Sequence, residues 1–133
     1  MSQDWDVQGM WAADEASRAL GMDLLEAADG RAVVRMTVRG DMVNGHSTAH
    51  GGLVASLADS AFAVACNSHG VVTVASGFDV TFLRPAYAGD VLVATAEERA
   101  VNGRSGVCDV TVRRTDGEVV AEFRGRSRAL PPS

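Results

Sequence analysis

The segment 51–68 constrains the fold of this chain more strongly than any other part of the sequence. It reads GGLVASLADSAFAVACNS, and across residues 53–66 its only polar side chains are Ser56, Asp59 and Ser60. A helix formed by this segment is apolar on almost every side, and such a helix is stable only inside a protein core. We therefore expect a buried central helix that carries a single acidic side chain.

The rest of the chain is typical of strands joined by tight turns. Apolar and polar residues alternate, so that Cys108, Val110 and Val112, for example, share one face of a strand. Short turns that contain glycine, such as Asp29-Gly30, join neighbouring strands and make them antiparallel. The elements expected outside the central helix are a short helix at 12–21 and strands at 22–28, 31–38, 73–84, 90–100, 105–114 and 118–128.

An antiparallel β-sheet wrapped around the central helix is the simplest arrangement that buries this helix. This α+β architecture is called the hotdog fold, and it is the fold class that we expect. The chain length fits a single domain over residues 1–133. Within it, LPPS at 130–133 is expected to be a loose C-terminal tail.

Composition and charge argue against several classes of function. A net charge of −5 and an aromatic content of only 5% disfavour a nucleic-acid partner. No apolar run reaches the roughly 20 residues that span a bilayer. The N-terminus is acidic and lacks the layout of a signal peptide, so we expect a cytoplasmic protein without membrane contact. Cys66 and Cys108 lie among apolar residues, which indicates reduced, packed thiols.

Asp59 is the first candidate for a catalytic residue. An ionised carboxylate that lacks a partner is costly to bury, and aspartate is also a poor residue for the interior of a helix. Asp59 could simply point to solvent or meet an arginine. The interpretation that we favour is that it acts as a base or a nucleophile in a partly dry site.

The glycine pair at the start of the helix is the second candidate. Backbone N–H groups at a helix start lack partners within the helix and lie at the positive end of its dipole. Gly51 and Gly52 have no Cβ, so a ligand can approach their backbone closely. This combination suits a developing oxyanion. His50 directly precedes the pair and Asn44 lies six residues earlier, which strengthens the interpretation.

A metal site is not predicted. His46 and His50 would have to lie on a helix to share a metal ion, whereas residues 39–50 are expected to form a loop. No third ligand is evident, and the chain contains no CxxC motif.

The spacing of Gly51 and Asp59 has a geometric consequence. Eight residues along one helix separate their backbones by roughly 12 Å. A hydrogen-bond donor to a carbonyl oxygen and a group that attacks the same carbonyl carbon must each lie within about 3–3.5 Å of it. An aspartate side chain is too short to span the difference. If both residues serve one substrate, they come from two chains of a symmetric dimer with two identical sites.

Two stretches of the sequence carry a resemblance to a known family. NGHSTAHGGLVASLADSAFAVACNS (44–68) and FLRPAYAGD (82–90) resemble the PaaI-type hotdog acyl-coenzyme A thioesterases, which are linked to phenylacetic acid degradation. The similarity extends over nearly the whole chain, through ALGMDLLEAADGRAVVRMTV (19–38) and EFRGRS (122–127). The combination of HGG, an acid eight residues after its first glycine, FLRP and AGD is fairly specific.

The resemblance implies hydrolysis of an acyl-coenzyme A thioester to a free acid and coenzyme A. The acyl groups that it implies are phenylacetyl, hydroxyphenylacetyl and similar aryl or short acyl groups. Coenzyme A is then part of the substrate, and no separate cofactor is expected. The resemblance further implies a homodimer, and a homotetramer built from two dimers.

By position in the motif, the resemblance implies a role for four residues. The Gly51 N–H polarises the thioester carbonyl, and Asp59 of the other subunit acts as nucleophile or general base. Asn44 helps to orient the attacking water or the thioester. His50, beside the oxyanion glycine, has an orienting role.

Four further residues are candidates for substrate binding: Gly52, Ser60, Arg84 and Arg104. The phosphates of coenzyme A need cations near the mouth of the site, which the two arginines could supply, although a surface arginine is usually only a solvated charge. Ser60 could position the substrate, or it could bond to its own helix backbone.

Two alternative functions stay open. A hotdog hydratase acting on enoyl-coenzyme A typically has a histidine a few residues from its aspartate at the helix start, and no histidine closely follows Asp59. A non-catalytic acyl-coenzyme A binding module would gain nothing from a buried carboxylate. Release of free thiol from an acyl-coenzyme A ester separates the thioesterase from both alternatives.

Overall fold

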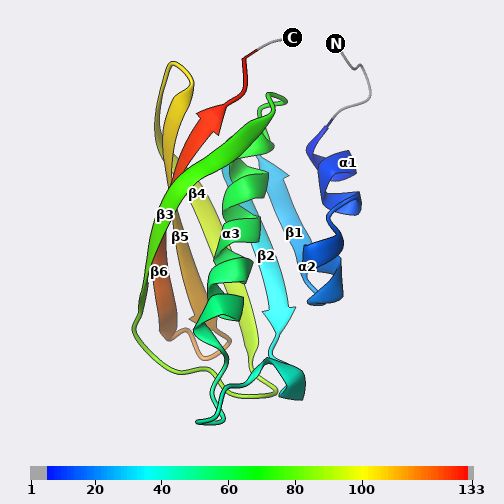
Figure 1. Cartoon of the computed structure of the whole chain (residues 1–133), viewed down its shortest axis with the longest axis vertical. Coiled ribbons are helices and arrows are strands. Elements are labelled where there is room, and N and C mark those ends of the chain that lie inside the picture. The colour runs from blue at the N-terminus through cyan, green and yellow to red at the C-terminus, as the bar shows by residue number, and fades with distance from the viewer. Residues whose placement is uncertain (1–5, 132–133) are drawn as a thin grey trace.

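The fold consists of one sheet and one long helix, with short helices beside them. The computed structural model describes residues 6–131 (Figure 1). Its helices are α1 (Val7–Ala12), α2 (Glu15–Ala19) and α3 (Gly51–Asn67), with a 3-10 turn, η1, at Gly40–Met42. Its strands are β1 (Asp23–Ala28), β2 (Arg31–Thr37), β3 (Thr73–Phe82), β4 (Val91–Asn102), β5 (Ser105–Arg114) and β6 (Val119–Ala129).

The six strands form one antiparallel sheet in the order β1-β2-β4-β5-β6-β3. Helix α3 lies along one face of this sheet and contacts all six strands, while α1 and α2 lie beside it (Figure 1). The hotdog fold expected from the sequence is therefore confirmed. Among the described residues, no helix is long and apolar enough to cross a membrane.

The core lies between α3 and the inner face of the sheet. The face formed by Cys108, Val110 and Val112 is fully buried, as the alternation predicts. Cys66 of α3 is buried as well, and both cysteines are free. A hydrogen bond with Cys66, together with burial, raises the pKa of the Cys108 thiol, so the Cys108 sulfur is a neutral core side chain.

A glycine on β6 lets α3 approach the sheet closely. A Cβ built on Gly125 would lie 2.7 Å from the Phe62 ring, which is closer than real side-chain contacts. The Phe62 ring fills this space and also packs at 5.8 Å from the ring of Phe123. The height of α3 above the sheet thus depends on the missing side chain at position 125.

The predicted helix at 12–21 is wrong at its start. The structure has two short helices there, because an aspartate begins each of them. The Asp6 side chain accepts a hydrogen bond from the Gly9 N–H at 2.6 Å, and Asp14 accepts one from the Ser17 N–H at 2.9 Å. Both aspartates are N-caps: Asp6 begins α1, which ends at Ala12, and Asp14 begins α2. The expected glycine stop is present, since Gly21 has a φ of +72°.

The strand predictions hold to within two residues at each end. Asp29 and Gly30 both have positive φ, which is the conformation that a two-residue hairpin turn requires. The predicted loose tail at 130–133 lies partly outside the described residues. Leu130, which is described, is held in place because its N–H donates to the Val72 carbonyl at 2.8 Å.

Candidate active site

The loop that leads into α3 is organised by one side chain. The Asn44 Oδ1 atom accepts hydrogen bonds from the His46 N–H at 2.9 Å, from the Thr48 N–H at 3.3 Å and from the Thr48 hydroxyl at 3.2 Å. Two backbone donors fix which end of the amide faces the loop. The Nδ2 group of Asn44 makes no hydrogen bond to any residue in 6–131.

His50 is the N-cap of α3. Its Nδ1 atom accepts a hydrogen bond from the Gly52 N–H at 3.3 Å, and its carbonyl accepts from the N–H groups of Leu53 and Val54. Its own N–H donates to the Met42 carbonyl at 2.8 Å. One histidine therefore satisfies most of the donors that a helix start leaves unpaired.

The Gly51 N–H is the donor that this cap leaves over. Within residues 6–131 it has no hydrogen-bond acceptor, although the N–H groups on either side of it are bonded. It lies in the first turn of α3, where the helix dipole adds positive potential. The His50 cap thus leaves one unpaired N–H group at the helix start, that of Gly51.

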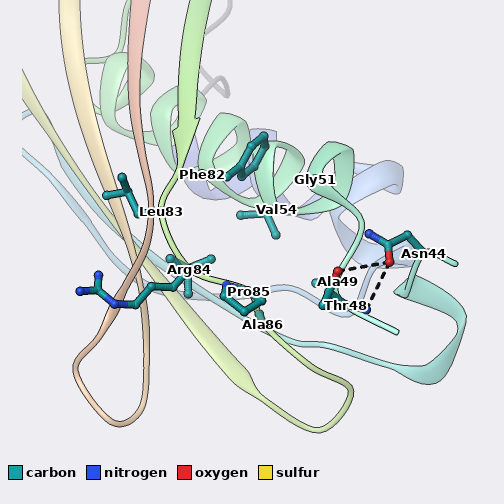
Figure 2. A pocket seen from close by; sticks show the side chains of 11 residues that line it. Asn44, Thr48, Ala49, Gly51, Val54, Phe82, Leu83, Arg84, Pro85 and Ala86 are labelled. Carbon is teal, nitrogen blue, oxygen red and sulfur yellow. Dashed lines mark hydrogen bonds between the residues drawn. The ribbon is translucent and has the colours of Figure 1, made fainter. Parts of the chain in front are cut away.

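Gly51 and Asn44 open onto the same pocket, which has a volume of about 390 Å³ (Figure 2). The Phe82 ring lies over the start of the helix, and a Cβ on Gly51 would lie 3.1 Å from it. The pocket combines two free N–H donors with an apolar wall. Its lining residues are Asn44, Thr48, Ala49, Gly51, Val54, Phe82, Leu83, Arg84, Pro85, Ala86 and Val120.

Asp59 is half-buried on the side of α3 that the sheet does not cover. It makes no ion pair or hydrogen bond within the described part of the chain, which excludes an arginine partner there. Burial raises the pKa of its carboxyl above the ordinary 3.8, and the negative charge of Asp14 on α2 raises it further. A half-dry carboxylate without a cation is a stronger proton acceptor than an ordinary aspartate.

Asp59 does not line the Gly51 pocket of its own chain. The two residues lie on one continuous helix, Gly51–Asn67, so the separation expected from the sequence holds within a single chain. The structure thus brings together Asn44 and Gly51, and keeps Asp59 apart from them.

The other predicted residues lie in different surroundings. The Gly52 N–H is bound to His50, and the Ser60 hydroxyl lies 2.7 Å from the Ser17 hydroxyl. Arg84 lines the pocket, but its side chain is directed away from Gly51 and pairs with Glu118 at 3.2 Å (Figure 2). Arg104 lies at the opposite end of α3, where it lines a smaller cavity of about 220 Å³ with Cys66 and His69.

Sequence reasoning missed Phe82 and Asp14. Phe82 ends a strand that was predicted two residues too long, and nothing in its local sequence indicates that it faces Gly51. Asp14 is part of the misassigned helix at 12–21. An aspartate at the start of a helix is a common N-cap residue, and this signal could have identified Asp14. Its side chain accepts a hydrogen bond from the Ser17 N–H.

Comparisons with known proteins agree with this fold. A family model described as the thioesterase superfamily matches residues 46–121, which is more than half of the chain. The acyl-coenzyme A thioesterase PaaI of Escherichia coli is 45% identical over 125 residues, covering 94% of this chain and 89% of that protein. The human acyl-coenzyme A thioesterase 13 is 34% identical over 93 residues, covering 68% of this chain and 66% of that protein.

The solved structure of the E. coli PaaI protein, from the phenylacetic acid degradation operon, superposes with a TM-score of 0.93. It is 44% identical and covers 96% of this chain and 93% of that one. The chain therefore belongs to the thioesterase superfamily. The PaaI-type hotdog resemblance seen in its motifs is confirmed, and the protein is a thioester hydrolase.

The raised pKa of Asp59 predicts that Asp59→Asn stabilises the protein at neutral pH. The folded chain holds the proton of this carboxyl more tightly than the unfolded chain does. Its contribution to stability is present below the ordinary pKa of 3.8 and is lost as pH rises through the raised value. The variant should melt at a higher temperature than wild type near pH ~7.5, with the difference shrinking toward pH ~4.

Thermal denaturation at equal protein concentration measures this effect. Asp41→Asn is the matched control, because Arg39 lowers the pKa of that exposed carboxyl and its removal should not raise the melting temperature. An Asp59→Asn melting temperature at or below that of wild type near neutral pH would contradict the prediction.

Proposed function

We propose that this protein hydrolyses acyl-coenzyme A thioesters to a free acid and coenzyme A. One observation carries the proposal: the Gly51 N–H is the unpaired donor at the start of α3 and opens onto a pocket with an apolar wall. A thioester carbonyl needs such a donor when it becomes an oxyanion. Kinship to the E. coli PaaI thioesterase supports acyl-coenzyme A as the class of substrate.

The oxyanion binds to groups that are already in place. The Gly51 N–H donates to the carbonyl oxygen, and the helix dipole behind it stabilises the negative charge. One donor of this kind is typically worth about 3–4 kcal/mol of transition-state stabilisation. The free Nδ2 group of Asn44, on the rim of the same pocket, orients the attacking water or the thioester.

Asp59 acts either as a general base or as a nucleophile in the attack on the thioester carbonyl carbon. As a general base it takes a proton from water while the water oxygen bonds to the carbonyl carbon, and the coenzyme A thiolate then leaves. As a nucleophile it bonds to that carbon itself, the thiolate leaves, and water hydrolyses the resulting anhydride. A thiolate leaves easily, so neither route needs a strong general acid.

The two halves of the site come from two chains in this proposal. Asp59 lies about 12 Å along α3 from Gly51, which is too far for one chain to use both groups on one carbonyl. The sheet offers a place for a second copy, because β3 pairs only with β6 and its other edge is free among the described strands. Exposed apolar side chains gather on this edge and just beyond it, namely Val74, Phe78, Phe82 and Leu83.

A homodimer formed along β3 would pair this edge and cover these side chains. It would also place a partner helix against the uncovered side of α3, where Asp59 lies. From the family resemblance we expect two such dimers to form a tetramer.

The pocket fits an aryl or a short acyl group next to the thioester. Its apolar side is made by Val54, Phe82, Leu83 and Val120. Phenylacetyl and hydroxyphenylacetyl esters are the first substrates to test, since the E. coli relative comes from a phenylacetic acid degradation operon. Of the two candidate arginines for the coenzyme A phosphates, Arg84 is the one at this pocket, and it would have to exchange Glu118 for a phosphate.

Thiol release from a panel of acyl-coenzyme A esters tests the proposed activity. Wild type should release thiol, and Asp59→Asn should lose about 10²–10⁴-fold in kcat/KM because the proton acceptor is gone. The variant must keep the wild-type oligomeric state by light scattering. Water addition to an enoyl ester without thiol release would indicate a hydratase, and tight binding without either reaction would indicate a binding module.

Two substitutions separate the effect of losing the Gly51 N–H from the effect of adding a side-chain carbon at this position. Gly51→Ala and Gly51→Pro both place a carbon next to the Phe82 ring, but only proline removes the N–H. Proline is tolerated at the first position of a helix, and His50, with φ −61° and ψ 129°, already has the conformation that precedes a proline.

We expect Gly51→Pro to have a kcat/KM about 10²–10³-fold below that of Gly51→Ala. Steady-state thiol release, with circular dichroism to confirm folding, measures the difference. Equal kcat/KM values for the two variants would show that this N–H is not the oxyanion donor.

Hybrid dimers test whether each site is shared between chains. One chain carries Gly51→Pro, its partner carries Asp59→Asn, and different affinity tags isolate the hybrid. One of its two sites then holds both defects and the other holds none, so the hybrid should recover about half of the wild-type activity. A hybrid as inactive as both parent variants, with both chains verified by mass spectrometry, would place the two residues in the same site of one chain.

A further inference from the structure

A chain of polar contacts fixes α2 against α3 next to the carboxylate of Asp59. The Ser60 hydroxyl lies 2.7 Å from the Ser17 hydroxyl, and the Ser17 hydroxyl donates to Asp14 Oδ2 at 2.6 Å. The Ser17 N–H donates to the other carboxylate oxygen, Oδ1, at 2.9 Å. Ser17 is only 3% exposed, so these contacts lie almost out of water.

The direction of the hydrogen bonds in this chain is determined. The Ser17 hydroxyl donates its hydrogen bond to Asp14. The Ser60 hydroxyl must therefore be the donor in its hydrogen bond to the Ser17 oxygen. Asp14 thus accepts from both groups of Ser17 and cannot turn away without breaking two bonds. A capping aspartate needs only the N–H bond, and the additional link through Ser17 to Ser60 ties this carboxylate to the residue next to Asp59.

The charges around Asp59 are unbalanced. Of the charged groups on the elements that pack against α3, which are α1, α2 and the six strands, Asp14 is the one within residues 6–131 whose charge acts on Asp59. Arg18, the cation of α2, forms an ion pair with Glu15 at 2.7 Å, and both side chains are exposed. The residues on α3 that share a face with Asp59 lie three and four positions away and carry no charge; they are Ala55, Ser56, Phe62 and Ala63.

We propose that Asp14 is a positioning residue for the catalytic base: Ser17 and Ser60 hold its carboxylate so that its negative charge makes Asp59 a stronger proton acceptor. The inference rests on the proposed role of Asp59. The repulsion between the two carboxylates favours the protonated form of Asp59, in the same direction as burial, which also raises its pKa. A base of raised basicity removes a proton from water more readily in the transition state.

Asp14→Asn tests the inference, because asparagine caps a helix as well as aspartate does and removes only the charge. The pH profile of kcat/KM should keep its shape while its acidic limb moves to lower pH, and the plateau rate should fall modestly. Asp6→Asn is the matched control, since Asp6 caps α1 in the same way and no action of its charge on Asp59 is seen. Its pH profile should coincide with that of wild type.

Carbon-13 NMR titration of the Asp59 carboxyl gives a readout that does not depend on turnover. In Asp14→Asn the midpoint for Asp59 should move to lower pH, and in Asp6→Asn it should not. Coincident titration curves for wild type and a folded Asp14→Asn would overturn the inference, even if thiol release is intact. A wild-type protein that releases no thiol would instead refute the proposed function, while the titration would still decide whether Asp14 acts on Asp59.

Discussion

The structure depends on the need to bury α3. Its apolar sides require a cover, and six antiparallel strands supply it on one side, where Leu57, Ala61 and Phe62 are almost completely withdrawn from water. Asp59 lies on the remaining side because a carboxylate cannot share that core. The same division that makes the fold stable therefore leaves a half-buried carboxylate outside the core.

The start of α3 presents one unpaired hydrogen-bond donor, the Gly51 N–H, to the pocket. A helix start normally presents several unpaired donors that water satisfies. Here the His50 side chain and carbonyl accept from the following N–H groups, and of the donors at the helix start the Gly51 N–H is the one without a partner within residues 6–131. The capping role of His50 explains why a polar residue directly precedes such an apolar helix. Its contribution is to order the donor beside it.

The sequence predicted the large elements well because their signals are local. The central helix, the alternating strands and the Asp29-Gly30 turn follow from periodicity and turn chemistry, and their positions were confirmed. The pairing of Asn44 with Gly51 at one pocket followed from a motif. The contacts of Phe82 and Asp14 could not be predicted, because they depend on which strand lies at the sheet edge and on how α2 docks. The helix at 12–21 was predicted from its early acids, its late Arg18 and the Gly21 stop, and this pattern did not indicate that Asp6 and Asp14 each cap a separate short helix.

The absence of a side chain at Gly125 on β6 affects the position of α3 above the sheet. Phe62 occupies the space above this glycine, and Phe62 follows Asp59 by one turn of the same rigid helix. A side chain at position 125 would force the Phe62 ring, or the helical turn that carries it, to move away from the sheet. In the proposed shared site, the position of one subunit's carboxylate relative to its neighbour's substrate would therefore depend on a glycine in the opposite layer of the molecule.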